Sequence, residues 1–346
     1  MSDGSGTKYP LIKEECSRCG TIRTGINFDT DSFYEDNYTP SRSLDTLAIK
    51  NNNATTRSLF IYEWITKLIK ESIHSFTSIL EIGCGQGYLL EKFNIKNRYG
   101  IEPNASAAKE AKNIANIREM GFEQLDDSEG YDLLVSYCVI EHIKNPAFML
   151  EKMHNILNEN GLMVIALPIQ DKLNYDLLFL DHLHHFHHKN FEVFLNNNHF
   201  SVINYELGSG SYSNIALYIC KKNATAQMKP YSYIHNKNIY NIHIILNSLH
   251  NIKNQYIHKE LYAFGFGEIA KTILPYAELD TLIKYYIDDY TSGEKVITSI
   301  KAKNIFREKE RVAVLLLVNV SHIQKVKSIF QEFKNINFID IFDGTK

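Results

Sequence analysis

The chain has 346 residues, and its 37 basic residues nearly balance its 40 acidic ones, which leaves a net charge of −3. This balance lacks the excess of positive charge that nucleic-acid binding requires, so we expect no nucleic-acid partner. The longest apolar run, Val312 to Val320, is too short to cross a bilayer, and the N-terminus has neither the basic start nor the apolar stretch of a signal peptide. We therefore expect no membrane association and a cytoplasmic location.

Five cysteines are an odd number, which does not suggest a disulfide scaffold. Cys16 and Cys19 form the run CSRCG, which has the local spacing of a zinc-ribbon knuckle. Tetrahedral zinc needs two more ligands, and no Cys or His lies upstream of Cys16 or soon after Cys19. The pair is thus half of a metal site, and a degenerate or truncated ribbon is favoured over bound zinc.

Residues 79–87 read ILEIGCGQG, a short apolar strand that reaches an acidic residue and then three glycines at alternate positions. Glycines without a Cβ leave room for a ligand against the backbone, and the helix expected over 88–93 points its first amides at the same place. The spacing differs from the G-x-G-x-x-G of nicotinamide-binding loops, which admits a pyrophosphate. A carboxylate ahead of the first glycine suits a cationic ligand better.

The second expected strand, residues 98–101, ends at Glu102. A carboxylate at this position can accept hydrogen bonds from both ribose hydroxyls of a nucleoside. The glycine loop and this acid resemble the cofactor site of class I S-adenosylmethionine (SAM) methyltransferases. The resemblance implies SAM as the cofactor, with contacts from Glu81, Gly83, Cys84, Gly85, Gly87, Tyr88, Glu102, Pro103, Phe122, Ser136 and Tyr137.

The later elements alternate between helices and strands. We expect a helix over 105–115, a buried strand within 131–143, a helix over 146–157 and a strand over 162–168. The strands expected at 200–207 and 214–221 are separated only by GSGSYS, which is too short for a crossover helix, so they must form an antiparallel hairpin. The fold class is therefore α/β, a Rossmann-like sheet that ends in a hairpin, as in class I methyltransferases.

Two histidine-bearing segments follow strands at the edge of the sheet where ligands bind. Glu141 and His142 follow the fourth strand, and DHLHHFHH, residues 181–188, comes after the fifth. His182 is the first choice as a base, with Asp181 tuning its imidazole, and His142 is the second. A positioning or packing role for the Glu141-His142 pair stays open, as does metal binding by the histidines of 181–188, two of which would share a helix face at 184 and 188.

A second α/β pattern follows a polar connection that begins near residue 223. After a helix-periodic stretch, residues 260–274 give a strand, the loop Gly265-x-Gly267-x-x-Ala270 and a helix, and a second strand ends at Asp288 and Asp289. Taken alone this is a passable dinucleotide fingerprint, which keeps a nicotinamide-dependent sugar oxidoreductase as an alternative. We expect an N-terminal extension over 1–45, a SAM domain over 46–222, a linker and helix over 223–258, and a smaller Rossmann-like domain over 259–346.

This order of parts resembles the sugar C-methyltransferase family over nearly the whole chain. The best local matches are EIGCGQG, YTPSRS, the Glu141-His142 and Asp181-His182 pairs, and AFGFGEIAK with YYIDD. The resemblance implies a small-molecule acceptor, a nucleotide-linked sugar or surface-polysaccharide precursor, that is methylated on carbon. Nothing in the sequence indicates an oligomeric state.

The chain departs from the family at two aromatic positions. Phe179 stands where the family has a Tyr two residues before its acid, and a Tyr-x-Tyr of the N-terminal segment is reduced to Tyr38-Thr39-Pro40. Two phenols that face the substrate are therefore expected to be missing. This weakens carbon methylation more than methyl transfer in general, and keeps O- or N-methylation of a glycan or other small precursor as an alternative.

Overall fold

A computed structural model describes residues 10–25, 29–37, 47–50, 53–172, 175–235, 237–318 and 322–342. The chain divides into two compact units. The larger unit consists of Ile12–Lys172 and Asp181–Asn236, and the smaller one of Met1–Leu11, Leu173–Leu180 and Lys237–Lys346. The domain limits expected from the sequence stay a prediction.

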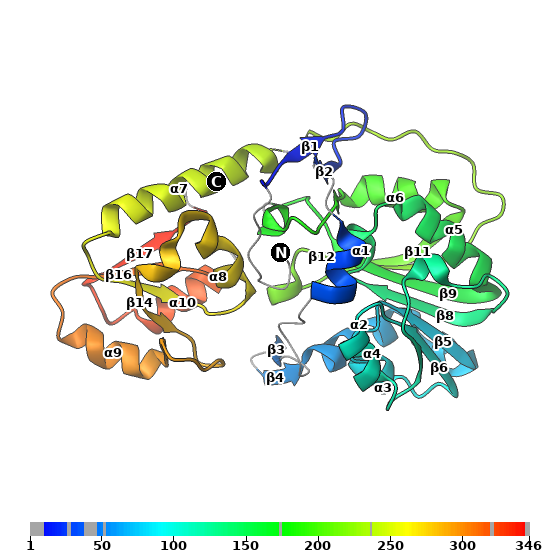
Figure 1. Ribbon diagram of the computed structural model, residues 1–346, viewed down its shortest axis with the longest axis horizontal. Helices are drawn as coiled ribbons and strands as arrows, with labels where there is room; N and C mark the ends of the chain where they lie inside the picture. Colours follow the sequence, from blue (N-terminus) through cyan, green and yellow to red (C-terminus); the bar gives the residue numbers. More distant parts are fainter. Residues whose placement is uncertain are drawn as a thin grey trace. The chain divides into compact units, whose positions relative to one another are not determined.

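A seven-stranded sheet forms the centre of the larger unit, in the order β11-β12-β9-β8-β5-β6-β7 (Figure 1). Neighbouring strands from β7 to β9 run parallel, whereas β12 is antiparallel to both β9 and β11. The predicted Rossmann-like sheet is therefore present, and an antiparallel hairpin lies at one edge. The strands are β5 (Ser78–Ile82), β6 (Asn97–Ile101), β7 (Asn116–Arg118), β8 (Tyr131–Tyr137), β9 (Leu157–Pro168), β11 (Phe200–Leu207) and β12 (Ile215–Lys222).

Helices cover both faces of this sheet. Alternate side chains of each strand point to opposite faces, so each face has apolar side chains that a helix layer buries. Leu80 and Leu134 lie in one apolar cluster with the buried faces of α5 (Pro146–Ile156) and α6 (His188–Asn197). Their neighbours in β5 and β8 lie in a second cluster, with α2 (Arg57–Ile69) and α3 (Tyr88–Lys92). Helix α4 (Ala105–Ala111) follows β6. Buried on both faces, these strands read as continuous apolar runs.

The order of the strands places a topological switch point beside β5. The chain moves from β5 through β6 to β7 on one side of the sheet, and then returns to build β8 and β9 on the other. In open α/β sheets, ligands bind in the crevice at the carboxyl ends of the strands at such a point. The loops after β5, β6 and β8 are therefore the ones that meet a ligand.

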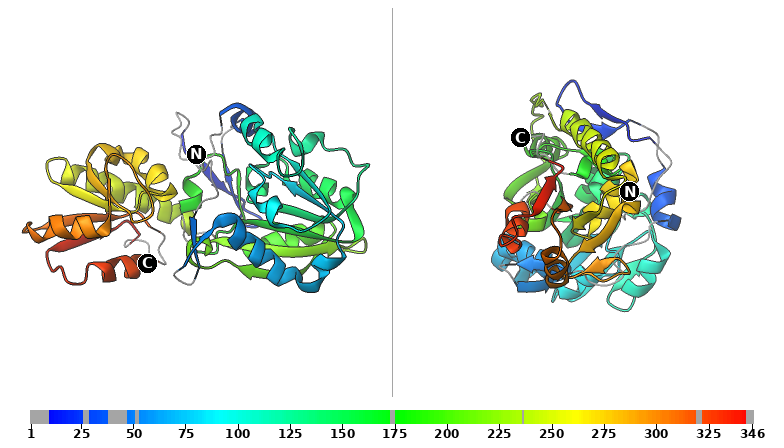
Figure 2. Two further views of the ribbon diagram at one scale, coloured as in Figure 1. Left: turned by 90° about the horizontal axis from the view of Figure 1, so that it is seen from below. Right: turned by 90° about the vertical axis from the view of Figure 1, so that its left-hand side faces the viewer.

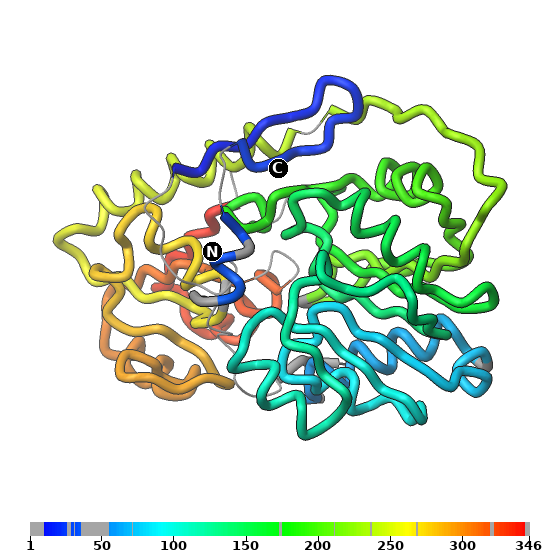
Figure 3. Tube along the Cα trace, turned by 45° about the vertical axis from the view of Figure 1, so that its right-hand side comes forward, coloured from blue at the N-terminus to red at the C-terminus, as the bar shows by residue number. Residues whose placement is uncertain are grey.

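The N-terminal hairpin, residues 12–25, adds a small sheet to the larger unit. Strand β1 (Lys13–Glu15) pairs antiparallel with β2 (Ile22–Thr24), and β2 pairs antiparallel with β10 (His184–His185). Figure 3 shows this hairpin as the dark blue loop. A three-residue helix α1 (Thr30–Ser32) and a π-helix (Phe33–Asn37) come next, and the strands β3 (Leu47–Lys50) and β4 (Asn53–Thr56) precede α2.

The smaller unit holds a five-stranded parallel sheet in the order β15-β14-β13-β16-β17, with helices on both of its faces (Figure 2). The segment Tyr175–Leu178 is a 3-10 helix of this unit, and the Tyr276 hydroxyl donates a hydrogen bond to the Leu178 carbonyl at 2.6 Å. The elements are α7 (Asn238–Tyr256), β13 (Leu261–Phe264), α8 (Glu268–Ile273), β14 (Ile283–Ile287), β15 (Val296–Ile297), α9 (Ser299–Arg307), β16 (Val312–Leu316), α10 (Ile323–Ile329) and β17 (Ile336–Asp340). Among the described residues, no helix is long and apolar enough to cross a membrane.

Candidate cofactor and active site

The glycine loop after β5 has a backbone that only glycine adopts easily. Gly83, Gly85 and Gly87 have φ angles of +70°, +52° and +82°. A Cβ on Gly83 would lie 2.6 Å from a methyl carbon of Val139, whereas a Cβ on Gly85 would meet nothing within 4 Å. The loop is therefore packed against Val139 at Gly83 and is open at Gly85, where a ligand has room to lie against the backbone.

Two buried acids flank this loop. Glu81, at the end of β5, is 5% exposed, and its Oε2 has no hydrogen-bond partner among the described residues. Burial, followed by the charge of Glu102, raises the pKa of Glu81 to about 8. The Glu102 carboxylate accepts hydrogen bonds from the backbone amides of Gly85 (2.8 Å) and Asn104 (2.9 Å). Burial raises the pKa of Glu102, and these two hydrogen bonds oppose the rise. A buried carboxylate oxygen without a partner fits a cationic ligand, such as the ammonium and sulfonium of SAM.

The other residues expected at the cofactor lie on the loops and strand ends around the switch point. Cys84 is buried, which raises the pKa of its thiol and keeps it neutral. The Ser136 hydroxyl, on β8, is also buried and has no hydrogen-bond partner within the described ranges. The Arg57 guanidinium lies 5.3 Å from the centre of the Tyr137 ring. Phe122 belongs to the core, and Tyr88 and Pro103 are half-buried. The cofactor roles of all these residues stay predictions.

The two histidine-bearing loops meet through a tyrosine that the sequence analysis missed. The Tyr34 hydroxyl donates to Asp181 Oδ2 at 2.8 Å and lies 2.7 Å from His142 Nδ1. His142 Nδ1 is also 3.0 Å from the Asp181 carbonyl oxygen. Because the tyrosine proton goes to the carboxylate and the carbonyl can only accept, the ring proton of neutral His142 belongs on Nδ1. The Nε2 lone pair is then the basic position.

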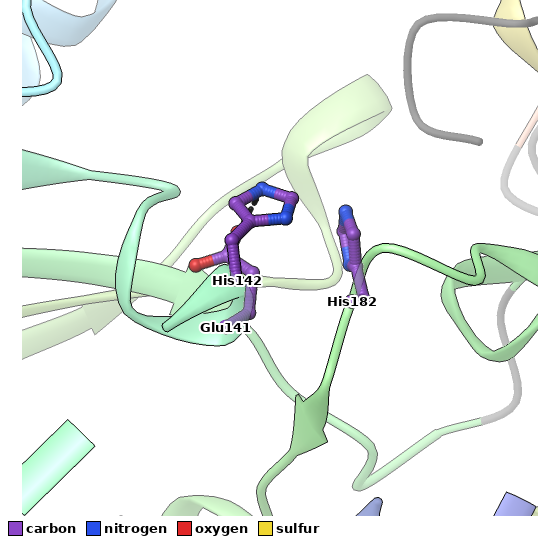
Figure 4. Close-up of side chains that lie close together, drawn as sticks. All are labelled: Glu141, His142 and His182. Carbon is purple, nitrogen blue, oxygen red and sulfur yellow. Dashed lines mark ion pairs between the residues drawn. The ribbon is translucent and has the colours of Figure 1, made fainter. Parts of the chain in front are cut away.

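Glu141 and His182 complete this cluster (Figure 4). Glu141 is 1% exposed, and one of its carboxylate oxygens lies 4.0 Å from His142 Nε2. The rings of His142 and His182 meet edge to face, with centroids 4.5 Å apart. One ligand atom of each of the three residues lies within 4.8 Å of the others, a spacing that could also hold a metal ion.

The structure rearranges the pairing that the sequence suggested. Asp181 was expected to tune His182, but its carboxylate lies 3.8 Å from His142 Nδ1 and accepts from Tyr34. His184 and His188 do not share a helix face, because residue 184 lies on β10 and α6 begins at residue 188. The segment Tyr38-Thr39-Pro40, where one phenol was expected to be missing, lies outside the described residues.

The cysteine pair Cys16 and Cys19 lies in the turn of the N-terminal hairpin. The Cys19 thiol lies 3.2 Å from the Thr21 hydroxyl, and backbone amides lower the pKa of Cys16. In the described part of the chain, none of the side-chain groups spaced to hold a metal ion includes either cysteine.

In the smaller unit, the two acids after β14 accept hydrogen bonds from backbone amides of neighbouring loops. Asp288 accepts from the backbone amide of Phe266 at 3.0 Å, and Asp289 accepts from the amide of Ser299 at 2.7 Å, at the start of α9. Gly265 has a φ of +99°, as the predicted loop requires. Binding of a dinucleotide by this loop stays an untested alternative.

Comparison with known proteins gives a family match for the middle part of the chain. Residues 53–205 match the family described as "Methyltransferase domain". The ubiquinone biosynthesis O-methyltransferase of Rhodopseudomonas palustris is 31% identical over 97 residues, which are 25% of this chain and 38% of that protein. The corresponding protein of a Bradyrhizobium species matches over the same share of both chains, also at 31% identity. This chain thus spans about two fifths of the length of the curated relatives that it matches.

Solved structures give more distant matches. A SAM-dependent methyltransferase from Clostridium acetobutylicum is 14% identical, with a TM-score of 0.40, and the match covers 48% of this chain and 91% of that one. The magnesium protoporphyrin IX methyltransferase of Synechocystis, solved with bound SAH, is 14% identical, with a TM-score of 0.39 and coverage of 48% and 81%. The family match is confined to one part of the chain. Over residues 53–205, the chain is similar to a methyltransferase domain.

Proposed function

We propose that this protein transfers a methyl group from SAM to a small activated metabolite, a nucleotide-linked sugar or a surface-polysaccharide precursor. One observation carries the cofactor assignment: Glu81 and Glu102 flank an open glycine bend at the carboxyl ends of adjacent strands. When bound, SAM supplies an electrophilic methyl group on a sulfonium. In this pocket, Glu81 would face the positive charge and Glu102 the ribose hydroxyls.

We propose His142 as the base that takes a proton from the acceptor, in place of His182, which the sequence favoured. Tyr34 and Asp181 hold its proton on Nδ1, so the lone pair of Nε2 is the position that would take a proton from the acceptor. The resulting imidazolium would lie 3.8 Å from the Asp181 carboxylate and 4.0 Å from the Glu141 carboxylate. Two buried acids on opposite ring nitrogens stabilise that charge, as in other carboxylate-oriented histidine bases.

We favour a carbon atom of the acceptor, rather than an oxygen or a nitrogen, as the site of methylation. A carbon acceptor must lose a proton beside a carbonyl before it attacks, so it requires an oriented base, whereas an oxygen or nitrogen acceptor needs only late deprotonation. Tyr34 also provides a phenol beside His142, although Phe179 and Pro40 depart from the family pattern. The order of the parts in the whole chain supports a sugar acceptor.

O-methylation is the second candidate. The matched curated relatives carry the name ubiquinone biosynthesis O-methyltransferase, and the match includes about a quarter of this chain. A sugar oxidoreductase that uses the Gly265 loop is a more distant alternative. The acceptors tested should therefore include hydroxyl compounds as well as keto sugars.

Cofactor binding provides the first test. SAM or SAH should raise the melting temperature of the purified protein, and NAD should leave it unchanged. Glu102→Ala should abolish the SAM shift, whereas Glu119→Ala, which removes an exposed acid paired with Lys112, should preserve it. A shift with NAD alone would move the assignment to an oxidoreductase.

Turnover provides the second test. Protein incubated with methyl-labelled SAM and a panel of keto-deoxysugar nucleotides should give a product that is heavier by one labelled methyl group, detected by mass spectrometry. His142→Gln should lose this product while its affinity for SAM is retained. Label only on hydroxyl acceptors would select O-methylation, and label on no acceptor would reject the proposed substrates.

A further inference from the structure

The N-terminal hairpin, residues 12–25, contacts the loop that carries the active-site histidines. Strand β2 extends this loop into a sheet, with Arg23 opposite His184 and Ile22 opposite His185. The backbone amide of Thr24 donates to the Leu183 carbonyl at 3.0 Å, and the Thr24 hydroxyl donates to the His182 carbonyl at 2.8 Å. The hairpin therefore contacts each residue from His182 to His185.

The turn of the hairpin, at the end away from the histidine loop, is held by contacts with two other segments of the larger unit. The Cys19 carbonyl accepts from the Asn190 side chain at 2.6 Å and from the backbone amide of Ile234 at 3.3 Å. Gly20, at a φ of +76°, lies so close that an added Cβ would be 1.8 Å from the Ile234 carbonyl oxygen. Hydrogen bonds and close packing thus hold this turn, so the hairpin is a fixed support for what it contacts.

Lys13 is the charged group that the hairpin brings to the histidine loop. Its ammonium donates to the Thr24 hydroxyl at 2.9 Å and to the His182 carbonyl at 3.1 Å, and lies 2.8 Å from His185 Nε2. An ammonium can only donate, so His185 Nε2 must accept, and the proton of this ring belongs on Nδ1. His185 is completely buried. Lys13 therefore fixes the tautomer of His185 and contacts the main chain of His182.

A row of rings connects this contact to the base. The rings of His185 and His182 stack with centroids 6.2 Å apart, and His182 meets His142 edge to face at 4.5 Å. Asp181, directly before His182, accepts from Tyr34 and faces His142. A displacement of the His182 main chain would therefore move both the ring against His142 and the carboxylate that orients it.

We propose that Lys13 is a positioning residue for methyl transfer, and that the cysteine-containing hairpin serves to place its ammonium against the histidine loop. The role rests on the proposed function, because it acts through His142 and Asp181. Loss of the ammonium should misplace the base without changing the glycine loop or Glu81. The cost should then fall on turnover rather than on cofactor affinity.

The test compares three variants by turnover and by calorimetric binding of SAM. Lys13→Met should lower kcat by about 10-fold or more, since small displacements of reacting groups have large effects on rate, and should keep the Kd for SAM within about twofold. Lys13→Arg, which retains a cation and its donors, should recover most of kcat. Arg23→Met is the matched control, because it removes an exposed cation of the same hairpin that pairs with Glu14, and it should behave as the wild type.

Three results would overturn the proposal: wild-type kcat in Lys13→Met, equal loss in Arg23→Met, or parallel loss of SAM binding and kcat. If Lys13→Met does not fold, Thr24→Val removes one partner of the ammonium and one donor to His182, and should lower kcat in the same direction.

A measurement without turnover separates this proposal from the proposed function. In a ¹⁵N spectrum of the histidine side chains, His185 should carry its proton on Nδ1 in the wild type and should lose this preference in Lys13→Met. If this holds and no acceptor is methylated, the function is wrong but the contact is real. A wild-type His185 protonated on Nε2 would refute the positioning role directly.

Discussion

Replacement of Glu81 with Gln should stabilise the ligand-free protein while it weakens SAM binding. Glu81 is 5% exposed, and burial together with the neighbouring charge of Glu102 raises its pKa to about 8. Gln keeps the shape of the side chain and removes its ionisation. The change therefore isolates the effect of one buried carboxylate.

The sign follows from the direction of the pKa shift. The folded chain holds a proton on Glu81 that the unfolded chain, with a pKa near 4.5, releases. The free energy of unfolding therefore falls as the pH rises from about 4.5 to about 8, by about 1.4 kcal/mol for each unit. At pH 7 this residue costs about 3 kcal/mol, and Glu81→Gln should recover about that amount relative to the wild type.

Chemical denaturation of both proteins at pH 5 and pH 7 measures this difference. Calorimetry with SAM should then show proton release from the wild type at pH 7, and affinity that rises toward pH 8, because the carboxylate must ionise to face a cation. Glu81→Gln should bind SAM about 10- to 100-fold more weakly, without this pH dependence. Equal SAM affinity in the two proteins, or a stability difference that does not change with pH, would refute the reasoning.

Three further changes test other parts of the molecule. Tyr34→Phe removes the hydroxyl between Asp181 and His142, so kcat should fall about 10- to 100-fold with an unchanged Kd for SAM, whereas unchanged kcat would remove Tyr34 from the mechanism. Gly85→Ala places a methyl group in the open side of the loop, so SAM should no longer raise the melting temperature of a protein that still folds, as circular dichroism can verify. Glu260→Gln removes a carboxylate whose pKa is lowered to about 2 by two lysine ammonium groups. The ionised carboxylate stabilises the folded protein by about 1 kcal/mol after solvent screening, above about pH 4.5, and this stabilisation is lost as the pH falls toward 2. Acid unfolding should therefore begin at higher pH in the variant.

The cofactor loop could be predicted because its geometry depends on local residues. Gly83, Gly85 and Gly87 all adopt positive φ, and the acid after β6 lies where a parallel neighbour of β5 must place it. The extent of some elements was harder to predict. Strand β9 begins at Leu157, before the expected start at residue 162, because Leu157 pairs with Tyr131 of β8. Such pairing is a tertiary effect that periodicity does not contain.

The cluster of side chains around His142 could be predicted only in part. The sequence indicated two histidine loops at the same edge of the sheet, since the carboxyl ends of parallel strands meet there. It could not show that Asp181 would orient His142, because the two residues are 39 positions apart and lie on different loops. Tyr34 lies 108 positions before His142 on a short π-helix, and no periodic signal marks it. Long-range contacts of this kind depend on how the loops pack.

The path of the chain limits how the protein could be divided into fragments. The chain leaves the larger unit after Lys172, contributes Leu173–Leu180 to the smaller unit, and returns at Asp181. Leu177 and Leu178 are buried in that excursion. Truncation at residue 236 would remove the rest of the smaller unit and expose these two leucines. Leu178 lies only three positions before Asp181, whose carboxylate faces His142. Fusion of the larger unit to a different C-terminal unit would therefore require that unit to pack against residues 175–180 in place of α7 and α8.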